Sequence, residues 1–329
     1  MVKYILCLLL LPSILIAQKN MPVQDTVLSN YKYPHAVYSL HLKSQGLHLQ
    51  MSYMDVKPPT PNGKVIMLLH GKNFNGAYWK TTIAALTKEG YRVIVPDQVG
   101  FGKSSKPVRY QFSFQQLAVN TKVVLEHLKI DKIHLLGHSM GGMLATRFLL
   151  MYPAMVEKLV LENPIGLEDW KLVVPYTPID SLYKSELRQH YDAVKKYQLE
   201  NYYDGKWKPE YDEWVYLLTA WVKHPHYKTV AWNNALTSEM VFTQPVLYEF
   251  EKIKSPTLLI IGTRDRTAIG KQNAPESLRT SLGQYQLLGK ATQQKIPGAE
   301  LVELDDVGHL PHIEAFEQFI GPLVSFLKK

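Results

Sequence analysis

Cysteine is almost absent from this chain of 329 residues, which has one, at position 7. Cys7 falls within an N-terminal segment that we expect to be removed, so the mature chain would have none. A chain without cysteine forms no disulfide bond, cannot be a thiol enzyme and offers no thiolate ligand to a metal. Its catalytic groups, if it has any, must therefore be other side chains.

A hydrophobic run long enough to cross a membrane is also lacking. Lys3 precedes an apolar run over residues 4–17, and polar residues follow at 18–20. A helix of about 14 residues spans roughly 20 Å, against about 30 Å for a bilayer core. The pattern is typical of a secretory signal peptide, residues 1–17, cleaved after Ala17 and followed by a linker, 18–34. We expect export to the periplasm or the medium, with no stable membrane insertion after cleavage.

No basic tract is dense enough for a nucleic-acid groove, although the net charge is +8. Nine Lys and Arg against twelve Asp and Glu give residues 167–250 a net charge of −3, so the excess of positive charge lies elsewhere. We expect a small-molecule substrate and no nucleic-acid partner. Oligomeric state is not readable from the sequence.

Apolar segments typical of strands alternate with amphipathic segments typical of helices. Two segments, 36–42 and 47–56, alternate around a turn and predict a hairpin. Further strands are predicted at 65–69, 91–97, 133–136, 156–162, 257–261 and 300–304, and helices at 78–89, 113–128 and 315–327. This order predicts an α/β fold with a mostly parallel sheet and helices on both faces.

The alternation stops near residue 166 and resumes near residue 255. Residues 167–250 hold 17 of the 36 aromatic residues and five of the six tryptophans, with helical patterns such as 181–200 and 211–223. We therefore predict a core in two parts, 35–166 and 251–329, with a helical lid, 167–250, inserted between them.

The sequence Gly-His-Ser-Met-Gly at 137–141 lies between a predicted strand and a helical pattern. This is the strand, sharp turn and helix context of a nucleophile elbow. The serine of such a turn has a strained backbone, and neighbouring backbone can approach only if the residues two before and two after it lack side chains. We predict Ser139 as the nucleophile.

A serine nucleophile needs a base, and the base needs an acid that orients it. His309 follows the strand at 300–304, and Asp265 follows the strand at 257–261, in the chain order Ser, Asp, His. All three residues follow strands whose carboxyl ends lie at one edge of a parallel sheet. We therefore predict His309 as the base and Asp265 as the acid. The acids that compete with Asp265 are Glu162, Asp305 and Asp306.

Three other histidines and one aspartate lie near these positions. We expect His138 to point into the fold, His70 to shape its loop by hydrogen bonding, and His312 to lie beyond the turn. Asp97 also ends a strand, but it precedes the elbow, and we expect it to anchor a loop.

A tetrahedral intermediate needs two N–H donors for its oxyanion. We predict the backbone N–H groups of Met140, directly after the nucleophile, and of Lys72, with Asn73 as the neighbouring candidate. We expect the Lys72 ammonium to be solvated, with a minor role if the substrate is anionic.

The chain resembles the α/β-hydrolase superfamily over nearly its whole mature length. The resemblance rests on His-Gly at 70–71, Gly-Phe-Gly at 100–102, the elbow, Gly-Thr-Arg-Asp at 262–265 and Gly-His at 308–309. It is strongest with the lidded serine hydrolases, which include esterases, carbon–carbon bond hydrolases and cofactor-free haloperoxidases. It implies an eight-stranded sheet, a cap after the sixth strand, and chemistry without a metal or organic cofactor.

The sequence predicts an exported serine hydrolase that acts on a small or medium, largely apolar carboxylic ester through an acyl-enzyme. Phe74, Trp79 and Trp170 are the candidate substrate contacts, because they lie close in sequence to the oxyanion loop or to the start of the lid. A carbon–carbon bond hydrolase with the same triad and a ligand-binding protein on a hydrolase scaffold are the alternatives. Amide and thioester substrates share the same oxyanion chemistry.

Overall fold

The computed structural model describes residues 22–329, which form one eight-stranded sheet in the order β1-β2-β4-β3-β5-β6-β7-β8. The strands are β1 (Val37–Ser44), β2 (Leu47–Val56), β3 (Val65–Leu69), β4 (Arg92–Pro96), β5 (Ile133–His138), β6 (Val156–Glu162), β7 (Thr257–Gly262) and β8 (Glu300–Leu304). β2 pairs antiparallel with β1 and with β4, and every other neighbouring pair is parallel. The predicted mostly parallel, eight-stranded sheet is confirmed.

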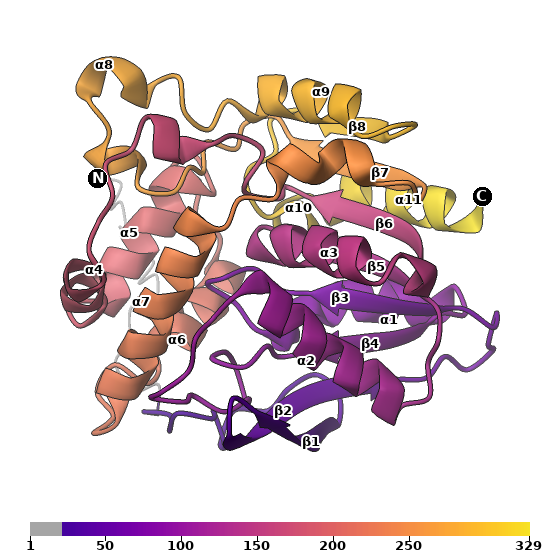
Figure 1. Ribbon diagram of the computed structural model, residues 1–329, viewed down its shortest axis with the longest axis horizontal. Helices are drawn as coiled ribbons and strands as arrows, with labels where there is room; N and C mark the ends of the chain where they lie inside the picture. The colour runs from indigo at the N-terminus through magenta and orange to yellow at the C-terminus, as the bar shows by residue number, and fades with distance from the viewer. Residues whose placement is uncertain (1–21) are drawn as a thin grey trace, which may run out of the picture.

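Helices cover both faces of the sheet (Figure 1). One face carries α2 (Phe114–His127), α3 (Met140–Met151) and α9 (Tyr285–Lys295), and the other carries α1 (Lys80–Lys88) and α11 (Phe316–Lys328). Successive side chains of β3 point to opposite faces of the sheet and enter two different cores. Because both faces are buried, the strand is apolar along its whole length. Met67 and Leu69 pack on the α2–α3 side, whereas Ile66 and Leu68 pack on the α1–α11 side.

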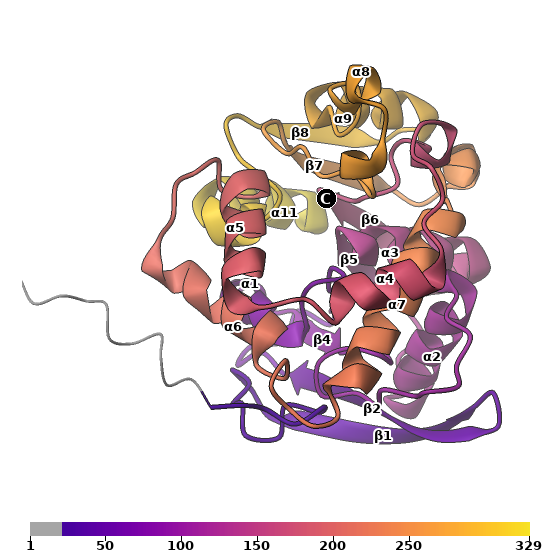
Figure 2. The same cartoon turned by 90° about the vertical axis from the view of Figure 1, so that its left-hand side faces the viewer.

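The segment between β6 and β7 is helical and lies beyond the carboxyl ends of the parallel strands (Figures 1 and 2). Its main helices are α4 (Ile179–Glu186), α5 (Tyr191–Asn201), α6 (Asp212–Thr219) and α7 (Tyr227–Thr243). The helical pattern over 181–200 corresponds to two helices, α4 and α5, rather than to a continuous one. His190 has extended backbone angles, and its ring nitrogen accepts a hydrogen bond from Ala193 N (3.3 Å), so it caps a new helix there.

The predicted signal peptide, 1–17, lies outside the described residues, as does the first part of the predicted linker. Residues 22–34 pack against the lid. Gln24 N donates to Ala220 O (2.8 Å), Tyr31 OH donates to Glu213 (2.5 Å), and the Leu28 side chain is fully buried. The described part of the linker is therefore held to the lid near α6.

Helix α9 was not predicted from the sequence. It contains Gly289, which normally weakens a helix. A Cβ at Gly289 would lie 3.1 Å from the Ile261 side chain of β7, so the glycine lets the helix approach the sheet closely. No helix within residues 22–329 is both long and apolar enough to span a bilayer.

Candidate active site

Ser139 lies at the turn between β5 and α3 with φ +55° and ψ −122°, outside the regions that most residues occupy. The flanking glycines allow this turn. A Cβ at Gly137 would lie 2.1 Å from the carbonyl oxygen of Gly141, and a Cβ at Gly141 would lie 2.2 Å from that of Leu69. The predicted steric reason for the Gly-x-Ser-x-Gly spacing is confirmed.

The structure brings together the three residues predicted to form a triad. The Ser139 Oγ lies 3.0 Å from His309 Nε2, and His309 Nδ1 lies 2.7 Å from Asp265 Oδ2. Ser139 is 7% exposed, and the other two side chains are almost completely buried. With Asp265 ionised, Nδ1 donates to the carboxylate and Nε2 is left to accept the serine proton.

The Asp265 carboxylate accepts two further hydrogen bonds, from Thr267 N to Oδ1 and from Asn163 Nδ2 to Oδ2, each 2.8 Å long. Burial acts to raise the pKa of Asp265, but the charge of His309 and the hydrogen bonds hold it below its usual value. Asn163 also accepts from Gly262 N (2.8 Å), so it joins the ends of β6 and β7. Asn163 directly follows the strand predicted at 156–162, and its role was not predicted from the sequence.

The competing acids lie elsewhere. Glu162 is fully buried and accepts hydrogen bonds from His312, through N (2.9 Å) and Nδ1 (2.7 Å). Asp305 and Asp306 are exposed, and Asp306 pairs with Arg264 (2.9 Å). None of the three replaces Asp265 as the partner of His309.

The other histidines are buried parts of the scaffold. His138 Nε2 donates to the backbone oxygen of His309 (2.7 Å), and its Nδ1 accepts from Tyr78 OH (3.0 Å). Burial lowers the pKa of His138 to about 3, so the ring is neutral. His70 accepts from Gln98 N (3.1 Å) and donates to the adjoining Gly71 carbonyl (2.9 Å), which confirms its predicted role in shaping the loop.

The predicted anchoring role of Asp97 is confirmed. Its carboxylate accepts from Gly76 N (2.7 Å), Lys103 N (2.7 Å) and Tyr33 OH (2.7 Å). These bonds tie together the loops that follow β3 and β4.

The predicted oxyanion donors lie on the two expected elements. Met140 begins α3, and Lys72 follows β3 in the loop that contains His70. Within residues 22–329, the backbone N–H groups of Met140, Lys72 and Asn73 donate to no other protein group. Each of them is therefore free to bind a ligand, and the choice between Lys72 and Asn73 stays open.

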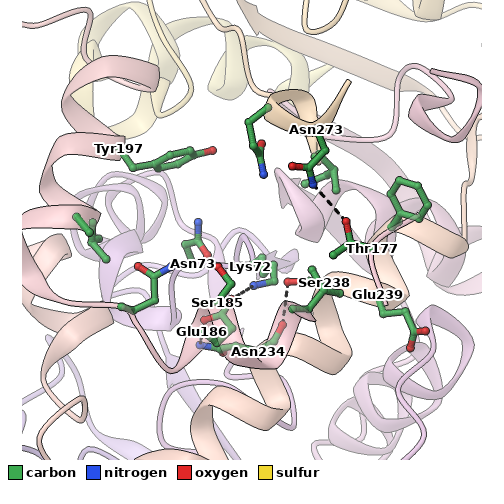
Figure 3. A pocket seen from close by; sticks show the side chains of 18 of the residues that line it. Lys72, Asn73, Thr177, Ser185, Glu186, Tyr197, Asn234, Ser238, Glu239 and Asn273 are labelled. Atoms are coloured by element: carbon green, nitrogen blue, oxygen red, sulfur yellow. Dashed lines mark hydrogen bonds and ion pairs between the residues drawn. The ribbon is translucent and has the colours of Figure 1, made fainter. Parts of the chain in front are cut away.

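A cavity of about 480 Å³ lies under the lid (Figure 3). Helices α4, α5 and α7 line it, together with the loop after β7 and with Lys72 and Asn73 of the oxyanion loop. Half of the lining residues carry polar or charged side chains, so the cavity is more polar than the largely apolar pocket we expected.

The three aromatic residues predicted to contact substrate do not line this cavity. Trp79 is fully buried and stacks on the His312 ring (4.2 Å between centroids), and Trp170 is bound through its indole N–H to Phe242 O (3.2 Å). Phe74 stacks on Tyr78 (4.8 Å). Closeness in sequence to a loop does not fix the direction of a side chain, and each of these three packs on another part of the protein.

The expectation that the Lys72 ammonium is solvated is wrong. The side chain is 15% exposed, lines the cavity and lies 3.7 Å from the carboxylate of Glu186 on α4 (Figure 3). The lid therefore supplies a counter-charge to the oxyanion loop.

Tyr202, just after α5, contacts the triad directly and was not predicted from the sequence. Its ring stacks on His309 with 4.8 Å between centroids and 27° between planes. A Cβ at Gly308 would lie 2.0 Å from the Tyr202 carbonyl oxygen, so the glycine lets the lid approach the histidine loop. The many aromatic residues of the lid gave no signal that could single out this one.

Comparison with known proteins agrees with this architecture. The profile of the alpha/beta hydrolase fold family matches residues 64–180. The crystal structure of a probable hydrolytic enzyme from Pseudomonas aeruginosa is 49% identical and superposes with a TM-score of 0.92, covering 94% of this chain and 99% of that one.

Two further relatives are more distant. Lipase 1 of Psychrobacter immobilis is 27% identical over 266 residues, 78% of this chain and 74% of the lipase. The 2-hydroxy-6-oxononadienedioate/2-hydroxy-6-oxononatrienedioate hydrolase of Comamonas testosteroni is 34% identical over 138 residues, 41% of this chain and 48% of that enzyme. The fold, the long match at 49% identity and these relatives together show that the chain is a hydrolase of the α/β-hydrolase family.

Proposed function

We propose that the chain is an exported serine hydrolase that cleaves a small or medium carboxylic ester through an acyl-enzyme on Ser139. The observation that carries the proposal is the continuous line of hydrogen-bond distances from Ser139 Oγ through His309 to Asp265, 3.0 Å and 2.7 Å long. Mutual contact between a nucleophile, a base and an orienting acid is the geometry that acyl transfer requires.

In the proposed reaction, His309 takes the Ser139 proton as the hydroxyl oxygen attacks the ester carbonyl. The oxyanion that forms accepts hydrogen bonds from the backbone N–H groups of Met140 and Lys72. His309 then gives its proton to the leaving alcohol. It next takes a proton from water as the water oxygen attacks the acyl carbon. His309 then returns this proton to Ser139 Oγ as the bond between the acyl carbon and Oγ breaks and the acid is released. Asp265 keeps the imidazole in the required tautomer throughout.

Export is proposed from the N-terminal sequence alone, with cleavage after Ala17 and a periplasmic or secreted mature chain. The absence of cysteine from residue 18 onward is compatible with an oxidising compartment. N-terminal sequencing of protein recovered outside the cytoplasm tests this part, and an N-terminus at Met1 would contradict it.

The activity is tested with the protein from Gln18 onward, its Ser139→Ala variant and Ser325→Ala, which removes an exposed serine of α11 as a control. Each is incubated with p-nitrophenyl esters of increasing acyl length, and the burst and steady-state release of p-nitrophenol are recorded. We expect wild type and Ser325→Ala to turn over with a stoichiometric burst. We expect Ser139→Ala to lose at least about 10⁴-fold in kcat.

Equal rates in wild type and Ser139→Ala would refute the acyl-enzyme. Absence of both burst and turnover in wild type would refute ester hydrolysis and would bring carbon–carbon bond hydrolysis and ligand binding forward. An acidic dienoate substrate is less well matched, because the lining within residues 22–329 has one cation, Lys72, and that cation is already paired with Glu186.

A further inference from the structure

Side-chain amides make up a quarter of the residues that line the cavity under the lid. Six of its lining side chains are carboxamides: Asn73, Gln189, Gln198, Asn234, Gln272 and Asn273. Ligand pockets are more often lined by hydrophobic groups with a few polar ones. Asn73, Asn234 and Asn273 each donate a hydrogen bond within the protein. An alkyl chain placed here would cover the remaining amide groups without giving them partners, which costs free energy.

One of these amides has no partner at all. Gln198 of α5 is 1% exposed, and within residues 22–329 neither its amide oxygen nor its amide nitrogen makes a hydrogen bond. A buried amide without partners destabilises a protein, so such groups call for an explanation. A ligand group in the cavity that both donates and accepts a hydrogen bond would satisfy it.

The charged groups of the lining do not select a charged ligand. The described lining residues include one cation and two carboxylates. Lys72 lies 3.7 Å from Glu186, and Glu239 accepts a hydrogen bond from Tyr176 OH (2.9 Å). The described lining therefore offers no unpaired cation and leaves one carboxylate in excess, which disfavours an anion and suits an uncharged, hydrogen-bonding ligand.

Polar groups surround the cavity rather than gathering at one point (Figure 3). Lys72, Glu186 and Ser238 lie on one side, and Asn273 and Thr177 lie across from them. A ligand with one amide could meet only one side of this wall. A ligand with hydroxyl groups around its ring could meet several sides at once, because a hydroxyl donates and accepts.

Two sets of contacts connect the wall of the cavity to the catalytic groups. Lys72 and Asn73 carry the candidate oxyanion donors, and Asn73 Nδ2 donates to Tyr202 OH (3.3 Å). Tyr202 stacks on His309, and its N–H donates to the Gln198 carbonyl (2.8 Å). Gln198 is therefore one helical turn from the residue that covers the catalytic base.

We propose that this cavity binds the hydroxyl-rich part of a sugar ester or related polyol ester, with Gln198 as a principal contact. The inference rests on the proposed function for the reaction, but its binding part can be tested without turnover. It names the polar portion of the substrate, whereas the triad requires only an ester.

The test measures binding by isothermal titration calorimetry to Ser139→Ala, which cannot form the acyl-enzyme. The ligands are a hexose monoacetate, cyclohexyl acetate, which lacks the hydroxyl groups, and N-acetylglycine ethyl ester, which supplies an amide instead. We expect Ser139→Ala to bind the hexose monoacetate at least tenfold more tightly than either of the others.

Two further variants are made in the Ser139→Ala background. Gln198→Met keeps the side-chain length and removes the hydrogen-bonding groups, and we expect it to lower the preference for the hexose ester about tenfold. Gln318→Met, on the exposed face of α11, is the matched control and should keep the preference. Because Gln198→Met also removes an unpaired buried amide, it should fold with a thermal midpoint no lower than that of its parent. Gln198→Leu serves as a second variant if it does not.

Equal binding of the three esters, tighter binding of the amide ester, or a preference unchanged by both Gln198 variants would each overturn the proposal. Wild type assayed with p-nitrophenyl acetate separates this proposal from the first one. Turnover of that ester without a hexose preference refutes only the polyol site. A hexose preference without turnover of any ester, the hexose monoacetate included, refutes only the hydrolase.

Discussion

Glu162 is expected to make the stability of this protein depend on pH. It ends β6 with no exposed surface and accepts hydrogen bonds from the backbone and ring nitrogens of His312. Burial raises the pKa of Glu162 from 4.5 to about 7, although His138 and the hydrogen bond from His312 N act to lower it. The Glu162 carboxyl group therefore gains or loses its proton near pH 7.

The direction of the effect follows from proton uptake. Between pH 4.5 and about pH 7 the folded protein binds a proton at Glu162 that the unfolded chain has released. This group therefore adds stability that is fully present below pH 4.5 and is lost as the pH rises through 7. Integrating the shift gives a loss of about 2.5 kcal/mol in unfolding free energy from about pH 5 to about pH 8.

The measurement compares urea unfolding of wild type and Glu162→Gln at both pH values. The amide oxygen of glutamine can accept the same two hydrogen bonds but does not ionise. We expect the variant to gain about 2.5 kcal/mol relative to wild type over this interval. Glu317→Gln, at an exposed position of α11, is the control and should show no such gain. A difference between wild type and Glu162→Gln that stays constant with pH would refute the reasoning.

Two further substitutions test the geometry of the site. Asp265→Asn should lower kcat by about 10⁴-fold while the circular dichroism spectrum stays that of wild type, because the amide favours the wrong tautomer of His309. A loss of less than about tenfold would show that another acid orients the base. Gly308→Ala places a Cβ 2.0 Å from the Tyr202 carbonyl oxygen, so we expect at least about 1 kcal/mol of destabilisation and a lower kcat/KM as Tyr202 moves off His309. Unchanged stability and activity would contradict this contact.

The sheet and the three triad positions could be predicted because their signals are local and repeated. Each of Ser139, Asp265 and His309 lies in the turn or loop that follows a predicted strand, and parallel strands bring such positions to one edge. The glycines near Ser139 and His309 indicated from the sequence that other backbone segments pack closely against these loops. The predictions of the strands needed no knowledge of how the lid folds.

The wall of the cavity could not be predicted in this way. Gln198 and Tyr202 are on and just after a lid helix whose polar and aromatic residues give no clear periodicity, and their contacts come from elements far away in the chain. Trp79 shows the converse, because an aromatic residue beside a functional loop packs on His312 instead. The position of Lys72 was predicted, but its pairing with Glu186 depends on how the lid docks.

The hydrogen bonds of Asn163 to Asp265 and Gly262 have a consequence for how the lid can be altered. Asn163 joins the end of β6, just before the chain leaves for the lid, to Gly262 and Asp265 at the end of β7, one strand after the chain returns. The carboxyl ends of the two strands that flank the insertion are therefore joined independently of what lies between them. A lid of another length and composition could be grafted between the same two strands with the acid kept in register. In this architecture, substrate specificity can change, in evolution or by engineering, through replacement of the whole lid.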